Sequence, residues 1–265
     1  MKTCLVIGAK GFIGSAVAAE AAARGYIVTA VDLDNYEASK GASADLLINV
    51  AGNSRKFIDD QDPVKGYELS VTSVMNVLHD FRFKFYVQLS SGAIYPNEGN
   101  PLENSEETFL QPSTMTRYGF HKWMAEQLVQ HYAPKRLIIR MGGFVGPGLK
   151  KNALFDLLTG GPLFVHPDSE FQYMDTRDLA KAVFELCEGA DRTETLLNLS
   201  ARGTVSVRQA AEWAGRALPE EAFSRPKVRA ELNVDKAARI ITLPETAKTV
   251  RQFISEVQSG KVQLK

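Results

Sequence analysis

Two side chains with complementary proton chemistry lie four residues apart in the stretch RYGFHK, namely Tyr118 and Lys122. Residues four apart in a helix share one face, and an ammonium group beside a phenol stabilises the phenolate. Lowering the pKa of a tyrosine from about 10 to near neutrality requires about 4 kcal/mol of such stabilisation. A tyrosine tuned in this way can exchange a proton with a hydroxyl or carbonyl group of a substrate.

The spacing alone is not specific, because Tyr36 and Lys40 repeat it in YEASK. What distinguishes the first pair is the stretch QLSSGAIYP, which places Ser90 and Ser91 directly after a predicted strand. Ligands of open α/β sheets bind at the carboxyl ends of the strands, so a hydroxyl there can hold a substrate oxygen beside Tyr118. We therefore expect a catalytic set of tyrosine, lysine and serine.

A glycine-rich turn, VIGAKGFIGS, follows the first apolar run. Between a strand and a helix, Gly8 permits the tight turn, Gly11 lets the backbone approach a pyrophosphate, and Gly14 lets the helix pack closely on the strand. Asp32 ends the next predicted strand, where a carboxylate accepts the ribose hydroxyls of NAD and repels a 2′-phosphate. Lys10, inside the turn, can pair with a 2′-phosphate, so NADP is kept as the alternative cofactor.

Short β-branched runs alternate with helical patterns along residues 1–145, and the strands are apolar on both faces. This alternation predicts a doubly wound α/β fold, a parallel sheet with helices on both faces. VKGYELSVTSVMNVLHDF is one of the predicted helices, and TLLNLS is expected to return as a further strand. We expect residues 1–145, joined by 174–200, to form the dinucleotide-binding domain, and residues 146–173 and 201–265 to form a smaller substrate lobe.

Composition excludes several classes of function for the 265 residues. Lys plus Arg equals Asp plus Glu, 31 each, which argues against a nucleic-acid partner. No apolar stretch approaches the roughly 20 residues that span a bilayer, and two cysteines, Cys4 and Cys187, are too few for a disulfide framework. We expect a soluble, cytoplasmic protein without a membrane partner. Four histidines without ligand spacing predict surface or partly buried side chains and no metal: His79, His121, His131 and His166.

Taken together, these motifs resemble the extended short-chain dehydrogenase/reductase family, the NAD-dependent epimerase/dehydratase group. The likeness runs from residue 1 to about residue 200, through GAKGFIG, INVAGN, LSSGAIY, YGFHK and RMGGFVGPG, and more weakly through YMDTRDLA and LLNLS. The resemblance implies a Rossmann fold, a small C-terminal substrate lobe and a homodimer formed by a helix pair.

The resemblance also implies roles for single residues. Tyr118 is the general acid/base, Lys122 both modulates its pKa and binds the cofactor ribose, and Ser91, four residues before Tyr95, donates a hydrogen bond to the substrate. Ser90 is the second choice for that donor. The cofactor-binding residues are then Gly8, Gly11, Phe12, Ile13, Gly14, Asp32, Ala51, Gly52, Tyr118, Lys122 and Gly143.

Departures from the family pattern bear on the substrate. Gly92 and Ala93 follow Ser91, where dehydratases of the family carry Asp-Glu, so 4,6-dehydration is not expected. Many nucleotide-sugar members have an arginine before the YMD stretch to hold the diphosphate, whereas residues 170–172 are Glu-Phe-Gln here. About a dozen residues separate Asp32 from Ala44, in place of a further strand and helix.

We therefore expect an NAD(P)-dependent oxidoreductase or epimerase that acts on a secondary alcohol or ketone, with a sugar nucleotide as the leading substrate. Two alternatives stay open from the sequence. One is a carbonyl reductase of a non-nucleotide substrate, which the missing arginine favours. The other is a sensor that binds the dinucleotide without turnover, which the complete set of Ser91, Tyr118 and Lys122 argues against.

Overall fold

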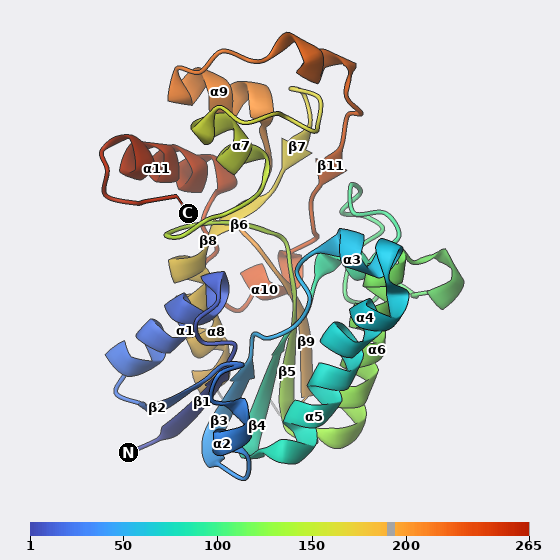
Figure 1. Cartoon of the computed structure of the whole chain (residues 1–265), viewed down its shortest axis with the longest axis vertical. Helices are drawn as coiled ribbons and strands as arrows, with labels where there is room; N and C mark the ends of the chain where they lie inside the picture. Colours follow the sequence, from blue (N-terminus) through green and yellow to red (C-terminus); the bar gives the residue numbers. More distant parts are fainter. Residues whose placement is uncertain (190–193, 265) are drawn as a thin grey trace. The chain divides into compact units, whose positions relative to one another are not determined.

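The computed structural model describes residues 1–189 and 194–264 (Figure 1). It divides into two compact units. The first unit consists of Met1–Pro96, Glu106–Met141 and Ala180–Asn198. The second unit consists of Asn97–Ser105, Gly142–Leu179 and Leu199–Lys265.

A six-stranded sheet with the order β2-β1-β3-β4-β5-β9 is the centre of the first unit. Its strands are β1 (Thr3–Ile7), β2 (Ile27–Val31), β3 (Ser43–Asn49), β4 (Arg82–Leu89), β5 (Arg136–Met141) and β9 (Glu194–Leu199). The pairs β1–β2, β1–β3, β3–β4 and β4–β5 are parallel. The predicted parallel α/β sheet is therefore confirmed, and TLLNLS returns to it as the predicted strand.

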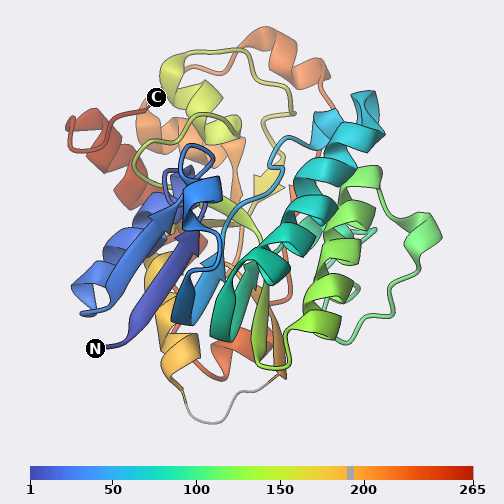
Figure 2. The same ribbon diagram turned by 60° about the horizontal axis from the view of Figure 1, so that its bottom comes forward.

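Helices cover both faces of this sheet (Figures 1 and 2). The helices of the first unit are α1 (Phe12–Ala23), α2 (Tyr36–Ser39), α3 (Lys56–Gln61), α4 (Pro63–Tyr67), α5 (Ser73–Asp80), α6 (Arg117–Tyr132) and the greater part of α8 (Thr176–Glu188). Figure 2 shows α5 and α6 side by side on one face, with α1 and the C-terminal part of α8 on the other. Apolar side chains of β1, β3 and β4 pack against α5 and α6 to form a continuous core.

The helix predicted over residues 64–81 is interrupted in the structure. A π-helical turn (Glu68–Thr72) separates α4 from α5. Such a turn widens the backbone by one residue and is often found beside functional sites. Ser70 lies in this turn, and its buried hydroxyl has no hydrogen-bond partner within the described chain.

The short connection after β2 leaves that strand at the edge of the sheet. Only α2, a single turn, lies between β2 and β3. Three of the five residues of β2 are exposed, and Ile27 keeps 51% of its surface accessible. The dozen or so residues between Asp32 and Ala44 are too few to form another strand. Nothing in the described chain therefore pairs with the outer side of β2.

A buried ion pair ties α6 to the sheet. The Nη2 atom of Arg140, at the end of β5, lies 2.8 Å from Oε2 of Glu126, which is fully buried on α6. Ser90 donates to Oε1 of Glu126 at 2.5 Å, and Arg140 donates through Nη1 to the hydroxyl of Tyr95 at 2.8 Å. Tyr95 in turn donates to Oδ1 of Asn198 at 2.9 Å. These contacts fix α6 against β4, β5 and β9.

The second unit contains two small sheets. β6 (Gly143–Val145) pairs in parallel with β8 (Tyr173–Asp175), and β7 (Glu170–Phe171) lies between β10 (Val205–Ser206) and β11 (Arg229–Ala230). Its helices are α7 (Ala153–Thr159), α9 (Val207–Ala214), α10 (Asp235–Ala238) and α11 (Thr246–Gln258). No helix in either described stretch is long and apolar enough to cross a membrane.

Glu126→Ala is expected to lower the free energy of unfolding by about 3–5 kcal/mol, because it leaves the Arg140 guanidinium buried without its counter-charge. Gln130→Ala, at an exposed position one turn later in the same helix, should change it by no more than about 0.5 kcal/mol. Urea denaturation of both variants measures the difference. Equal losses in the two variants would show that the ion pair does not anchor α6.

Candidate active site

The glycine turn between β1 and α1 has the shape required to hold a dinucleotide. Gly8 has φ +81°, a left-handed conformation that favours glycine, and its N–H donates to the carbonyl of Val31 at 2.8 Å. A Cβ at Gly14 would overlap with the carbonyl oxygen of Gly8. Gly11 caps α1, and within residues 1–189 and 194–264 no side-chain cap satisfies the first N–H groups of this helix. These N–H groups therefore fit a pyrophosphate.

Two carboxylates flank the turn. Asp32, directly after β2, accepts from the main-chain N–H of Lys10 at 2.9 Å and from that of Leu33 at 2.9 Å. The ammonium group of Lys10 pairs with Asp34 rather than facing open solvent alone. Lys10 was the reason to keep NADP as an alternative cofactor, and Asp34 neutralises its charge.

Tyr118 and Lys122 lie on the first turns of α6. Thr116 caps this helix by accepting from the N–H of Gly119 at 3.0 Å. The hydroxyl of Tyr118 donates to the main-chain oxygen of Asn53 at 3.2 Å, and Nζ of Lys122 lies 5.5 Å from the centre of the Tyr118 ring. Both side chains are buried. The predicted shared face is therefore present, with the ammonium group beside the phenol.

Burial lowers the pKa of Lys122 from 10.5 to about 8. Asp59 and Glu126 oppose this effect, since their negative charges favour the ammonium form. Lys122 therefore keeps a proton at neutral pH in a site that excludes most water, and there an ammonium group stabilises a neighbouring phenolate more strongly than it would at the surface.

The repeated spacing at Tyr36 and Lys40 has a different setting. Nζ of Lys40 lies 5.7 Å from the centre of the Tyr36 ring, close to the distance in the other pair. Yet the hydroxyl of Tyr36 donates to Oδ2 of Asp80 at 3.0 Å, and burial together with this carboxylate raises the pKa of Tyr36. Tyr36 is therefore held in its neutral form.

The two neighbouring serines differ in availability. Ser90 is buried, and its hydroxyl is committed to Glu126. Ser91 is partly exposed, and its Oγ accepts from the N–H of Ala93 at 3.2 Å. A Cβ at Gly119 would overlap with the carbonyl oxygen of Ala93, so the turn after Ser91 packs closely on the start of α6. Of the two hydroxyls, that of Ser91 is free to donate to a further group.

The loop after β3 joins the glycine turn to Lys122. A Cβ at Gly8 would lie 3.0 Å from the N atom of Ala51, and a Cβ at Gly52 would lie 3.0 Å from Nζ of Lys122. Gly52 has φ +139°, so this close approach depends on glycine. The structure thus brings the turn, Ala51, Gly52 and the helix of Lys122 together in the first unit.

The remaining predicted cofactor residues have separate places. Phe12 and Ile13 open α1 and are half-buried. Gly143 belongs to the second unit, where a Cβ would lie 2.7 Å from the carbonyl oxygen of Gln172. No group of three or more His, Cys, Asp or Glu side chains suited to a metal was found in the described chain.

Three residues of the site were not singled out by sequence reasoning: Asn53, Asp59 and His121. Asn53 follows the VAG segment directly, which is the one local signal that places it near Tyr118. His121 was predicted to be a surface or partly buried histidine, but its Nδ1 lies 2.6 Å from Oδ1 of the buried Asp59. Their sequence separation gives no sign of this contact.

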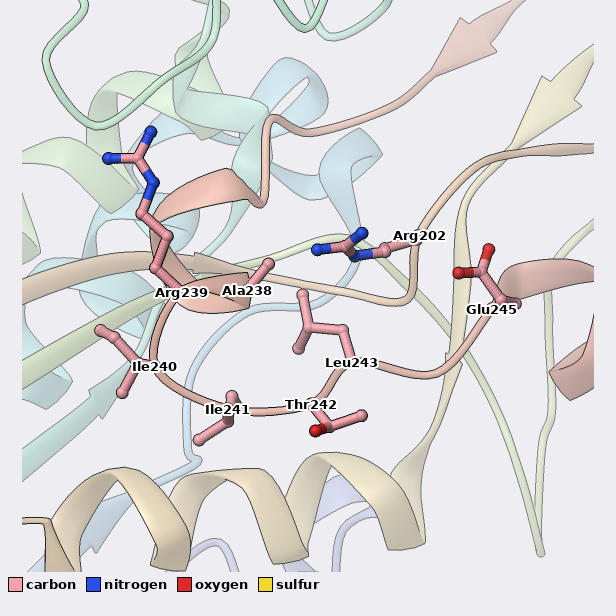
Figure 3. Close-up of a pocket in the computed structure, with 8 residues that line it drawn as sticks. All are labelled: Arg202, Ala238, Arg239, Ile240, Ile241, Thr242, Leu243 and Glu245. Atoms are coloured by element: carbon pink, nitrogen blue, oxygen red, sulfur yellow. The ribbon is translucent and has the colours of Figure 1, made fainter.

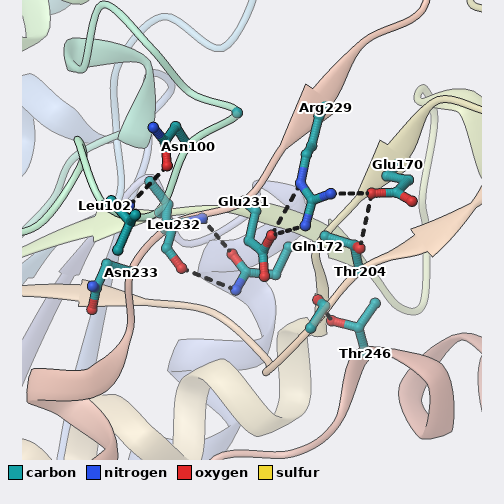
Figure 4. Close-up of polar contacts among 12 residues, drawn as sticks. Asn100, Leu102, Glu170, Gln172, Thr204, Arg229, Glu231, Leu232, Asn233 and Thr246 are labelled. Atoms are coloured by element: carbon teal, nitrogen blue, oxygen red, sulfur yellow. Dashed lines mark hydrogen bonds and ion pairs between the residues drawn. The ribbon is translucent and has the colours of Figure 1, made fainter.

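The stretch before YMD is occupied by contacts within the second unit (Figure 4). Oε2 of Glu170 lies 2.7 Å from Nη1 of Arg229, whose Nη2 lies 2.6 Å from Oε2 of Glu231. The side chain of Gln172 is buried and exchanges hydrogen bonds with the main chain of Leu232. The arginine beside this stretch therefore comes from β11, and two carboxylates neutralise it.

The second unit also has an open pocket of about 480 Å³ (Figure 3). It is lined by Arg202, Ala238, Arg239, Ile240, Ile241, Thr242, Leu243 and Glu245. The main chain of Arg202 donates to Pro244 and accepts from Thr246, which holds the lining segment in place. None of these lining residues belongs to the predicted catalytic or cofactor-binding sets.

Comparisons with known proteins identify the family and the fold. The model of the NAD dependent epimerase/dehydratase family matches residues 4–200. A solved UDP-galactose 4-epimerase is similar at TM-score 0.76 and 22% identity, over 97% of this chain and 99% of that one. MoeE5 in complex with UDP-glucose and NAD gives 0.78 and 18%, over 98% and 99%. No curated protein sequence matches the chain.

A reductase shows the same fold. The dTDP-4-dehydrorhamnose reductase from Bacillus anthracis, solved in complex with NADP, is similar at TM-score 0.74 and 15% identity, over 96% of this chain and 98% of that one. At these identities the three solved structures bear on the fold, while the family match covers most of the sequence.

The ammonium group of Lys122 should titrate near pH 8, because burial disfavours its charged form. NMR of ¹³C-labelled lysine side chains measures this, with the signal assigned by its loss in Lys122→Met. The exposed Lys84, which is paired with Asp45, should remain protonated well above that pH. A midpoint for Lys122 at or above the ordinary 10.5 would contradict the burial that the structure assigns to it.

Proposed function

The chain belongs to the NAD-dependent epimerase/dehydratase family, and from this premise we propose that it is an NAD(P)-dependent oxidoreductase or epimerase that acts on a secondary alcohol or ketone of a sugar nucleotide. One observation carries the proposal. The buried Tyr118–Lys122 pair lies against the loop of Asn53 and Gly52, and the same loop packs on the glycine turn. Proton transfer and dinucleotide binding then occur at adjoining positions in one unit.

Each side chain of the set has a separate task. Tyr118, as phenolate, removes the proton of a substrate hydroxyl, and as phenol it returns the proton to a carbonyl oxygen. The ammonium group of Lys122 lowers the free energy needed to ionise the Tyr118 hydroxyl, and it can donate hydrogen bonds to a ribose. The Ser91 hydroxyl donates to the substrate oxygen and orients it. The nicotinamide, when bound, accepts or returns the hydride.

Cofactor recognition follows from the glycine turn and its carboxylates. The free N–H groups at the start of α1 hold the pyrophosphate, and Asp32 accepts the hydroxyls of the adenosine ribose. Asp34 neutralises Lys10, which leaves the charge of Asp32 to repel a 2′-phosphate. The geometry favours NAD over NADP. The other residues proposed to line the cofactor are Gly8, Gly11, Phe12, Ile13, Gly14, Ala51, Gly52 and Gly143.

A carbonyl reductase of a non-nucleotide substrate is the second candidate. The contacts of Arg229 favour it, because Glu170 and Glu231 already neutralise the arginine beside the YMD stretch. Mass spectrometry of ligands that stay bound through purification separates the candidates. A retained nucleoside diphosphate sugar supports the first, and a small ketone or alcohol without a nucleotide supports the second.

Tyr118→Phe is expected to lower kcat by about 10²- to 10⁴-fold, because the ring remains and the proton donor is lost. The assay follows reduced nicotinamide by absorbance over a panel of sugar nucleotides and small ketones. Tyr36→Phe is the matched control, since it removes the other tyrosine with a lysine four residues later. Full activity in Tyr118→Phe would show that Tyr118 is not the proton donor. If the native chain binds NAD but turns over no member of the panel, the chain is a sensor and not a catalyst.

NAD is expected to bind at least about tenfold more tightly than NADP, a difference of about 1.4 kcal/mol from the repulsion between Asp32 and a 2′-phosphate. Asp32→Asn should narrow this ratio, whereas Glu37→Gln, an exposed change on α2, should leave it unaltered. Fluorescence titration with the two cofactors measures it. Tighter binding of NADP by the native chain would reverse the proposed preference.

A further inference from the structure

A buried acidic side chain lies beside the proposed catalytic pair without belonging to it. Asp59, on α3, is fully buried, and each of its carboxylate oxygens is bound. Oδ2 accepts from Nδ2 of Asn53 at 2.5 Å, and Oδ1 lies 2.6 Å from Nδ1 of His121 on α6. On the side of α4, a Cβ at Gly66 would lie 2.5 Å from Oδ1, so the carboxylate has no room for another partner there.

The first link from Asp59 to the reaction runs through Asn53. The side chain of Asn53 donates to the carbonyl of Arg55 at 3.1 Å and accepts from its N–H at 2.8 Å, which folds the loop after Gly52 into a turn. Asp59 holds the same amide from the other side. The main-chain oxygen of Asn53 is the acceptor for the hydroxyl of Tyr118. A shift of the Asn53 side chain therefore moves the main-chain oxygen of Asn53, which orients the hydroxyl of Tyr118.

The second link is electrostatic. A Cβ at Gly52 would lie 3.0 Å from Nζ of Lys122, and the next residue, Asn53, binds Asp59 through its side chain, so the carboxylate lies near the buried ammonium group. The charge of Asp59 is the largest of the effects that keep Lys122 protonated against burial, and that of Glu126 is the next. Two nearby anions favour the charged form of a desolvated lysine.

His121 gives the carboxylate a donor and is itself fixed. Its side chain is 9% exposed, and its ring makes an edge contact with that of Tyr67, with centroids 5.7 Å apart. Tyr67 of α4 is the titratable group in contact with the His121 ring, and Lys122 of α6 is the charged group on which Asp59 acts. Arg117, at the start of α6, donates to the main-chain oxygen of Asp60 on α3.

We propose that Asp59, paired with His121, is a positioning residue for proton transfer by Tyr118, because it clamps the Asn53 loop against the phenol and places a negative charge beside Lys122. The inference rests on the proposed roles of Tyr118 and Lys122. It assigns a task to a histidine and a carboxylate 62 positions apart, whose contact bridges α3 and α6.

Asp59→Asn tests the electrostatic link without requiring a known substrate. The variant keeps the shape and removes the charge, so the midpoint of the Lys122 titration, followed by NMR of ¹³C-labelled lysine, should move to lower pH by about one unit. Asp60→Asn, the exposed neighbour on α3, should leave the midpoint where it is in the native chain. An unchanged or higher midpoint in Asp59→Asn overturns the proposal.

The histidine supplies a second pair of variants in case Asp59→Asn does not fold. His121→Gln keeps an N–H donor for the carboxylate, and His121→Leu removes it. We expect His121→Gln to retain the native midpoint of Lys122 and His121→Leu to lower it, because a buried carboxylate that loses one of its two donors is less stable in its charged form. Equal midpoints in the two variants would overturn the proposal.

Activity separates this inference from the proposed function on which it rests. With a substrate in hand, Asp59→Asn should lower kcat by about 10- to 100-fold with KM within about twofold of native, and move the basic limb of the kcat–pH profile downward. If Tyr118→Phe abolishes turnover while Asp59→Asn leaves both kcat and that limb unchanged, only this inference fails. If Tyr118→Phe is fully active, the proposed function fails first.

Discussion

The buried pair between Glu126 and Arg140 is the constraint on which the site depends. It bonds the middle of α6 to the end of β5, and through Ser90 to the end of β4. Removing either charge would leave the other buried without compensation, so the helix cannot slide or rotate without a large cost. The first two turns of α6, which carry Tyr118 and Lys122, therefore keep a fixed place over the strand ends.

The same ion pair explains why the neighbouring residues Ser90 and Ser91 have different roles. Ser90 and Ser91 differ by one position at the end of β4, so their side chains point in different directions. One hydroxyl serves the anchor at Glu126, and the other remains partly exposed. Lys122 lies one helical turn before Glu126, and its ammonium group gains from the charge that anchors the helix. The carboxylate of Glu126 thus both anchors α6 and helps to keep Lys122 protonated.

Local patterns predicted the fold and most of the first unit's candidate site. Apolar runs gave the parallel strands, and glycines at intervals of three gave the turn before α1, because both depend on neighbours in sequence. The π-helical turn at Glu68–Thr72 was not predicted, since α4 and α5 have one continuous helical pattern. The contact between Asp59 and His121 was missed for another reason: it depends on how α3 packs on α6, which no spacing encodes.

The two Tyr–Lys pairs show why spacing cannot identify a catalytic tyrosine by itself. Both place an ammonium group between 5 and 6 Å from a phenol ring, at 5.5 Å for Tyr118 and 5.7 Å for Tyr36. A carboxylate accepts the hydroxyl of Tyr36, which favours the neutral phenol, whereas a main-chain carbonyl accepts that of Tyr118. A carbonyl carries no net charge to repel a phenolate, so the neighbouring ammonium decides its stability. The acceptor of the hydroxyl, together with the burial of the lysine, distinguishes the two tyrosines.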